Sequence, residues 1–274
     1  MFYEEKGRGQ PVVFVHGTIC DYRAWSAQTE SLSSGFRTIA YSRRYARPNE
    51  KEGDVMDSTV QNNSADLEAL IRGLGLEGVH LAGHSYGGFI AAHFATQHPD
   101  LLRSLTLVNA AVVTMLVKRA SSTAALGLLL RSPGVALSAR RVVNATSATD
   151  KAVDGGDRSA AERIFIPALE NGQTGLPAKP QGFSEMVADN ARTLRETTTP
   201  YPVLTAREAK SIRTPTLVVW GELSAPWDSR ISEMLSKSIP RCEEARIAGT
   251  GHFCLGENPR EFNERMRAFL TKNS

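Results

Sequence analysis

The sequence predicts an α/β fold in which a mostly parallel central sheet is flanked by helices and carries an inserted helical segment. Short apolar runs alternate with helical patterns from Pro11 to Ala110, as the strand–helix units of a parallel sheet do. The alternation stops after Ala110 and resumes at Thr216, so one α/β core with one appendage is expected. A chain of 274 residues is long enough to form both.

The predicted strands are continuous apolar runs rather than alternating ones, which is typical of central strands covered by helices on both faces. They lie at 12–15, 38–41, 79–82, 105–108, 216–220 and 244–248. Helical apolar spacing predicts helices at 58–73, 86–98, 229–238 and 259–271. The helix at 86–98 ends before Pro99, because proline cannot continue it.

Residues 1–110 and 212–274 are therefore assigned to the core, and residues 111–211 to an inserted helical cap, or lid. The apolar spacing of the insertion is helical but is broken at Pro133, at Gly155 and Gly156, and between 172 and 180. We expect several short helices there and no extension of the sheet.

The composition indicates a globular chain with a buried core and no nucleic-acid partner. The net charge is only +3, from 32 basic and 29 acidic residues, and the basic residues form no stripe. Three cysteines without metal or disulfide spacing suggest neither a zinc site nor a disulfide framework and favour a cytoplasmic location. No metal and no other cofactor is expected. The longest apolar stretch, Ala124 to Leu130, is too short to span a bilayer, so no membrane partner is expected. A small-molecule substrate is the expected partner, and a homodimer is left open.

Ser85 is predicted to be a nucleophile. It is the centre of Gly83-His84-Ser85-Tyr86-Gly87, a GxSxG pattern that follows a predicted strand and opens a predicted helix. Glycines at 83 and 87 remove the Cβ atoms that would clash where the chain reverses sharply around the serine.

Two further segments complete the predicted site. His16-Gly17-Thr18 follows the first strong strand, and the backbone amides of Thr18 and Tyr86 are predicted to form an oxyanion hole. His252 follows the last strand and is predicted to be the general base that serves Ser85. The other histidines are interpreted as structural.

These segments resemble the α/β-hydrolase superfamily, in its cap-bearing branch with a serine nucleophile. The matching segments are HGT (16–18), GHSYGG (83–88), PTLVVWGE (215–222) and GHFCLGENPREF (251–262). The branch includes esterases, C–C hydrolases, haloperoxidase-like enzymes and lactonases, so the resemblance implies an α/β-hydrolase fold and a metal-free hydrolase. Epoxide hydrolases and haloalkane dehalogenases are disfavoured, because they carry aspartate where this chain has Ser85. An ester, thioester or lactone of a small, largely apolar carbonyl compound is the expected substrate, and C–C bond hydrolysis or lyase chemistry is the alternative.

The acid that orients His252 is left open. The two positions at which the family carries it are occupied by Ser224 and Asn109, neither of which is charged. Asp228 is one alternative, although its place before a predicted helix favours N-capping. Asn109 and Glu222 are the other two. Loss of the acid would slow turnover, so a ligand-binding protein with little activity is a further hypothesis.

Overall fold

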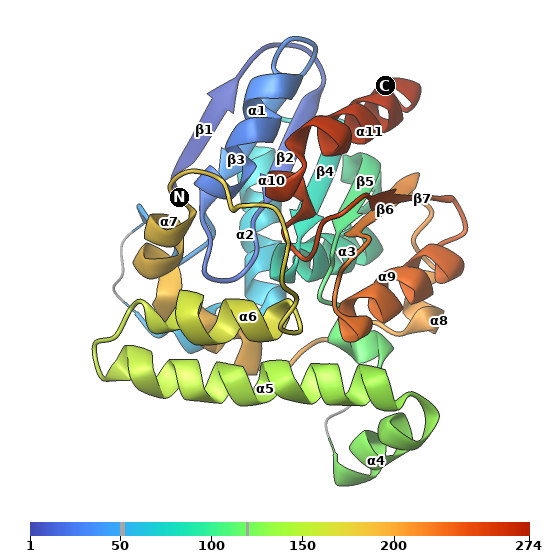
Figure 1. The fold of residues 1–274 in the computed structure, drawn as a ribbon. Helices are drawn as coiled ribbons and strands as arrows, with labels where there is room; N and C mark the ends of the chain where they lie inside the picture. The colour runs from blue at the N-terminus through green and yellow to red at the C-terminus, as the bar shows by residue number, and fades with distance from the viewer. Residues whose placement is uncertain (50–52, 119–120) are drawn as a thin grey trace.

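The computed structural model describes residues 1–49, 53–118 and 121–274. The strands in these residues form one seven-stranded sheet in the order β1-β3-β2-β4-β5-β6-β7 (Figure 1). Strand β1 is antiparallel to β3, and every other neighbouring pair is parallel. The predicted α/β fold class, with its mostly parallel sheet, is confirmed.

The strands are β1 (Tyr3–Lys6), β2 (Pro11–Val15), β3 (Arg37–Tyr41), β4 (Val79–His84), β5 (Leu102–Val108), β6 (Thr216–Gly221) and β7 (Cys242–Ile247). Strands β4 and β6 are buried along their whole length, as their continuous apolar runs predicted. Strand β1 is exposed throughout and contains no apolar run, so the apolar pattern could not reveal it.

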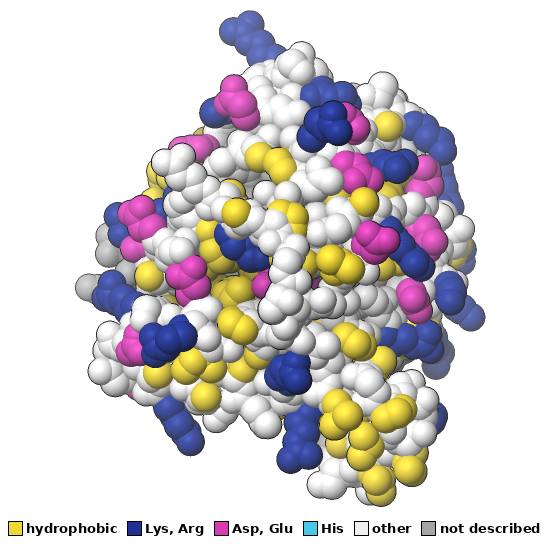
Figure 2. Space-filling model, viewed as in Figure 1, with side chains coloured by type: hydrophobic (Ala, Val, Ile, Leu, Met, Phe, Trp, Pro, Cys, Tyr) yellow, Lys and Arg dark blue, Asp and Glu magenta, His cyan; other side chains and the backbone are white. Residues whose placement is uncertain are grey.

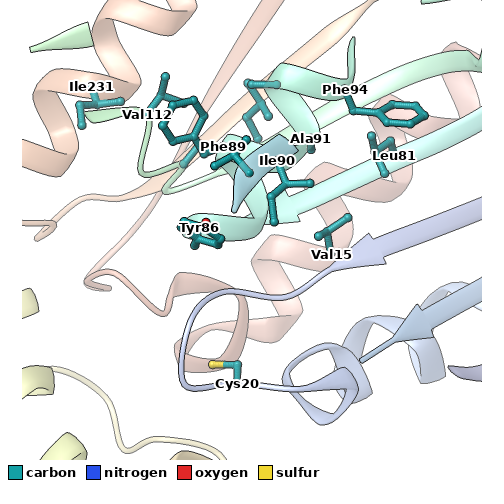
Figure 3. Close-up of a cluster of buried hydrophobic side chains, with 14 of the residues drawn as sticks. Val15, Cys20, Leu81, Tyr86, Phe89, Ile90, Ala91, Phe94, Val112 and Ile231 are labelled. Carbon is teal, nitrogen blue, oxygen red and sulfur yellow. The ribbon is translucent and has the colours of Figure 1, made fainter. Parts of the chain in front are cut away.

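Helices cover both faces of the sheet. Helices α1 (Ser26–Leu32) and α11 (Pro259–Lys272) lie on one face, and α2 (Val60–Gly73), α3 (Tyr86–Gln97) and α9 (Pro226–Ser238) lie on the other (Figure 1). Val12 and Phe14 of β2 belong to the apolar cluster of the first face, whereas Val13 and Val15 belong to that of the second. Figure 3 shows the second cluster, where side chains of α3 such as Phe89 pack beside β2 and β4.

The chain between β5 and β6 is helical. Its longer elements are α4 (Ser122–Arg131), α5 (Pro133–Asp154), α6 (Ile166–Leu169), α7 (Phe183–Asn190) and α8 (Ala206–Ala209), with the π-helical turn η5 (Ala161–Phe165) and the 3₁₀ helix η6 (Ala191–Thr198). The short turn η4 (Val113–Met115) also lies between β5 and β6. The short helical turns in the rest of the chain are η1 (Tyr22–Trp25), η2 (Val55–Asp57), η3 (Pro99–Leu101) and α10 (Cys254–Glu257). Among the described residues from 111 to 211 there is no strand.

The predicted break at Pro133 separates two helices, since α4 ends at Arg131 and α5 begins at Pro133, but the expectation of short helices only is wrong. Pro133 is the first residue of α5, where its missing N–H has no helical partner to lose, and α5 then runs for 22 residues. Helices α5 and α6 lie across the end of the sheet at which the parallel strands finish (Figure 1). The division into core and cap at 110/111 and 211/212 stays a prediction. In the described part of the chain, no helix combines the length and apolar character needed to cross a membrane.

Candidate active site

Ser85 stands between β4 and α3 in a strained backbone conformation. Its φ of 54° and ψ of −120° lie where a residue with a side chain is held only by its surroundings, at a cost of about 1–3 kcal/mol. The amide of Ser85 donates to the Val108 carbonyl (2.9 Å), and the Ser85 carbonyl accepts from Gly88 (2.9 Å) and Ala111 (2.9 Å). These bonds tie the turn to the adjacent strand β5 and to the first turn of α3.

Glycine is required at two positions of this turn. A Cβ on Gly83 would lie 2.3 Å from the Gly87 carbonyl oxygen, and a Cβ on Gly87 would lie 2.3 Å from the Val15 carbonyl oxygen. Both separations are far below van der Waals contact with backbone atoms that cannot move freely. A Cβ on Gly17 would come within 3.0 Å of the Ser85 Cβ, so the loop after β2 passes directly beside the predicted nucleophile.

That loop contains Thr18, one of the two predicted oxyanion donors. The Thr18 hydroxyl donates to the Thr193 carbonyl (3.1 Å), and the amide of Ile19 donates to the Thr193 hydroxyl (2.9 Å). Helix η6 therefore fixes the loop. Tyr86 is the first residue of α3, so its amide has no partner within the helix. Within the described part of the chain neither the Thr18 nor the Tyr86 amide donates a hydrogen bond, so both can donate to a ligand.

His252 is held by Asp228. The His252 Nδ1 lies 2.7 Å from Asp228 Oδ2, and the two side chains are 1% and 0% exposed. Because a carboxylate can only accept, Nδ1 carries the hydrogen and Nε2 of a neutral ring presents a lone pair. That Nε2 is buried and has no partner in the described part of the chain.

Asn109 and Ser224, which occupy the family's two acid positions, support Asp228 rather than His252. The Asn109 Nδ2 donates to Asp228 Oδ2 (2.7 Å) and to the Ser224 hydroxyl (2.8 Å). Glu222 lies elsewhere, and its carboxylate accepts from the Gly249 amide (3.0 Å). Of the three alternatives left open by the sequence, the structure brings only Asp228 into contact with His252.

The interpretation of Asp228 as an N-cap is wrong. Helix α9 begins at Pro226, three residues before the predicted start, and its N-cap residue is Ala225. Asp228 therefore belongs to the first turn of the helix and is buried. Its carboxylate turns inward to Nδ1 of His252 and does not cap the backbone.

Comparison with known proteins assigns the family. The model of the alpha/beta hydrolase family matches residues 12–265. The chain belongs to this family. Mouse (Mus musculus) epoxide hydrolase 3 is 24% identical over 96% of this chain and 71% of its own. An uncharacterized carboxylesterase, nap, of Bacillus subtilis is 24% identical over 95% of this chain and 79% of its own. A solved esterase from Thermogutta terrifontis matches with a TM-score of 0.66 and 25% identity, over 99% of this chain and 93% of that one. The protein is a hydrolase enzyme.

The imidazole ring of His84 lies beside that of His252 in this hydrolase. Its Nε2 lies 3.0 Å from the His252 carbonyl oxygen, and the two ring centroids are 5.0 Å apart. Burial lowers the pKa of His84 to about 3, so the ring is neutral at physiological pH. His84 therefore donates to the loop of His252 as a structural residue.

Arg43 anchors the loop that precedes Thr18 in this hydrolase. Its guanidinium donates to the carbonyls of His16 (3.0 Å) and Gly17 (3.1 Å) and pairs with Glu196 of η6 (2.6 Å). Arg43 and Glu196 are 1% and 0% exposed, and the guanidinium lies 5.1 Å from the ring centre of Tyr86. A buried ion pair thus joins the loop that precedes Thr18 to helix η6.

A second charged group joins the helical segment between β5 and β6 to the loop of His252 in this hydrolase. Lys179 pairs with both Glu170 and Glu257, and the other oxygen of Glu257 accepts from the Gly251 amide (2.6 Å). Burial raises the pKa of Glu170, while Lys179 opposes that rise. The sequence did not reveal this group, because Lys179 and Glu170 meet Glu257 only through the fold of residues 111–211.

The buried cysteines are unsuited to nucleophilic chemistry in this hydrolase. Burial raises the pKa of both Cys20 and Cys254, which keeps each thiol protonated at neutral pH. In the residues that the structure describes, no three His, Cys, Asp or Glu side chains are grouped to hold a metal ion.

Proposed function

We propose that this hydrolase cleaves an ester, thioester or lactone of a small, largely apolar carbonyl compound through an acyl-enzyme on Ser85. The observation that carries the proposal is the buried pair of His252 and Asp228 at 2.7 Å, which leaves His252 Nε2 without a described partner. A base fixed in this tautomer is what a serine hydroxyl needs in order to become a nucleophile.

In the proposed first half-reaction, Ser85 Oγ attacks the carbonyl carbon and His252 Nε2 takes the hydroxyl proton. The Asp228 carboxylate stabilises the resulting imidazolium. The amides of Thr18 and Tyr86 hold the negative oxygen of the tetrahedral intermediate. When the C–O bond of the ester breaks, His252 returns the proton to the leaving alcohol and the acyl group stays on Ser85.

In the second half-reaction a water molecule attacks the acyl carbon, with His252 Nε2 again taking the proton. Collapse of the second tetrahedral intermediate breaks the bond to Ser85, and the imidazolium returns the proton to Ser85 Oγ. The products are a carboxylic acid and the free enzyme. A serine alkoxide suits this acyl chemistry, whereas relatives that open epoxides use a carboxylate at the same position.

An apolar acyl group is favoured by the side chains next to the site. Phe253 follows His252 in the chain, and Phe183 of α7 packs on it with ring centroids 5.0 Å apart. Met115, Phe165 and Met186 are buried in the same cluster. The aromatic pair beside His252 favours a hydrocarbon group over a charged one.

Labelling with a fluorophosphonate, combined with ester turnover, tests the proposal. The intact mass should rise by one probe in the parent, and the adduct should map to the peptide that contains Ser85. Ser85→Ala should gain no mass and should not hydrolyse a p-nitrophenyl ester, whereas the exposed-serine control Ser121→Ala should match the parent.

An adduct elsewhere, or full turnover by Ser85→Ala, would overturn the assignment of the nucleophile. Rapid labelling without ester turnover would instead favour the protein with little activity that binds a ligand. Cleavage of a diketone without ester turnover would favour the C–C hydrolase alternative.

A further inference from the structure

Helix α4 carries apolar side chains that the rest of the molecule does not cover. Leu126, Leu129 and Leu130 are 56%, 41% and 76% exposed, and no residue of α4 is buried. Leu137, in the first turns of the neighbouring helix α5, is 60% exposed. We call these four leucines the α4 surface. In Figure 2 hydrophobic side chains gather at lower right, over the position of α4 in Figure 1.

An amphipathic helix normally buries its apolar stripe, so an uncovered one indicates a partner. The length of the apolar stretch bears on which partner. The apolar stretch Ala124–Leu130 is too short to form a segment that spans a bilayer. The same length is sufficient for a helix that lies in the plane of a lipid surface, with leucines in the acyl boundary.

The charge around the α4 surface has one sign. Between Ala111 and Thr149 the chain contains five basic residues, Lys118, Arg119, Arg131, Arg140 and Arg141, and no aspartate or glutamate. Lys118, Arg131 and Arg140 are exposed, and none of the three has an ion pair within the described part of the chain. Exposed leucines flanked by unpaired cations complement the acyl chains and phosphates of an anionic lipid surface.

A second copy of the chain fits this surface less well. Two copies related by a two-fold axis would meet with the same patch and would bring Arg131 and Arg140 of both chains together. No acidic residue of the same segment would compensate them, so the repulsion would oppose the burial of the leucines.

We propose that the α4 surface docks on an anionic lipid surface. Leu126, Leu129 and Leu130 enter the boundary between headgroups and acyl chains, and Arg131 and Arg140 contact lipid phosphates. This inference concerns binding alone and does not depend on the proposed acyl chemistry. It replaces the expectation that a membrane is no partner, which rested only on the absence of a spanning stretch.

Co-sedimentation of the purified full chain with vesicles tests the proposal. We expect binding to phosphatidylcholine vesicles that contain phosphatidylglycerol, which weakens as salt is raised, and weak binding to phosphatidylcholine alone, which does not depend on salt. Leu126→Ser/Leu130→Ser should lower the partition coefficient about tenfold or more, because two apolar anchors are lost. Arg131→Glu/Arg140→Glu should lower it by about tenfold or more on the anionic vesicles only.

Matched controls separate the α4 surface from general charge and general apolarity. Arg8→Glu/Arg265→Glu makes the same charge change at the far end of the molecule, near the β1–β2 turn and α11, and should bind as the parent does. Met56→Ser removes an exposed apolar side chain, 42% exposed, outside the α4 surface and should also bind normally. Equal thermal midpoints would verify that each variant is folded.

The proposal is overturned if the parent does not bind anionic vesicles, or if the α4 variants bind as well as the controls do. It is also overturned if light scattering shows a dimer that Leu126→Ser/Leu130→Ser dissociates while no variant binds lipid. That result would assign the α4 surface to a second copy of the chain.

Discussion

Replacing Asp228 with asparagine removes the negative charge beside His252 while conserving the size of the side chain. In the structure the carboxylate oxygen Oδ2 accepts both from His252 Nδ1 (2.7 Å) and from Asn109 Nδ2 (2.7 Å). The amide of the variant can still occupy this space. What it cannot do is stabilise the imidazolium that forms when His252 takes the proton of Ser85.

The size of the effect follows from the separation of the charges. Two unit charges about 4 Å apart, at an effective dielectric constant of about 20, attract each other by about 4 kcal/mol. Loss of that amount from the transition state corresponds to a rate reduced by about 10³. Replacing the aspartate of a serine protease triad with asparagine costs about 10⁴, because the wrong tautomer is also favoured. We therefore expect kcat for Asp228→Asn to fall by about 10³–10⁴.

Steady-state hydrolysis of a p-nitrophenyl ester measures this effect. Two variants serve as controls: one replaces another carboxylate, and the other removes the amide that contacts Asp228. Glu222→Gln should keep kcat within about twofold, because its carboxylate binds only the Gly249 amide. Asn109→Ala should lose about tenfold or less, since it removes one hydrogen bond to Asp228 and leaves the charge in place. The reasoning would be refuted if Asp228→Asn kept at least a tenth of the parent activity, or if Glu222→Gln lost more than Asp228→Asn.

Three further predictions concern stability and the charged groups around the site. Burial lowers the pKa of His16, and it lowers the pKa of His84 to about 3 and that of His80 to about 4. The native rings therefore stay neutral at pH values where the unfolded chain, whose histidines have an ordinary pKa of about 6.5, takes up protons. The free energy of unfolding should therefore decrease as the pH is lowered from about 6 to about 4, by about 4 kcal/mol per pH unit for three such histidines. His84→Gln keeps two of the three, so chemical denaturation of this variant should show about two thirds of that slope. Glu196→Gln leaves the Arg43 charge buried without its partner, so calorimetry should show a loss of about 3–5 kcal/mol, or roughly 10 °C, whereas the exposed control Glu185→Gln should melt with the parent; equal midpoints for both would contradict the role given to the pair. Lys179→Met leaves Glu170 beside Glu257 without the cation that both contact, so turnover of a p-nitrophenyl ester should fall at neutral pH; turnover equal to that of the parent would argue against this role.

The sheet and the turn at Ser85 could be predicted from the sequence because their signals are local. Buried strands such as β4 and β6 are continuous apolar runs, and the GxSxG pattern contains its own glycines. Strand β1 has no such run, and its pairing with β3 depends on backbone hydrogen bonds that any side chains permit.

The partner of His252 was harder to predict, because it depends on where one helix begins. A start at 229 makes Asp228 a cap, whereas the observed start at Pro226 places it in the first turn and against the ring. Proline at the first helical position was the signal available for this earlier start. Contacts between distant segments, such as Arg43 with Glu196, leave no local pattern at all.

The central claim is that Ser85 becomes covalently acylated during turnover. The most direct measurement is the intact mass of the protein after acid quenching in the first turnovers of a p-nitrophenyl ester, followed by peptide mapping. The account predicts a mass gain of one acyl group, on the peptide that contains Ser85, and no gain for Ser85→Ala. Release of nitrophenol by the parent with no acylated protein, or with the acyl group on another residue, would contradict it.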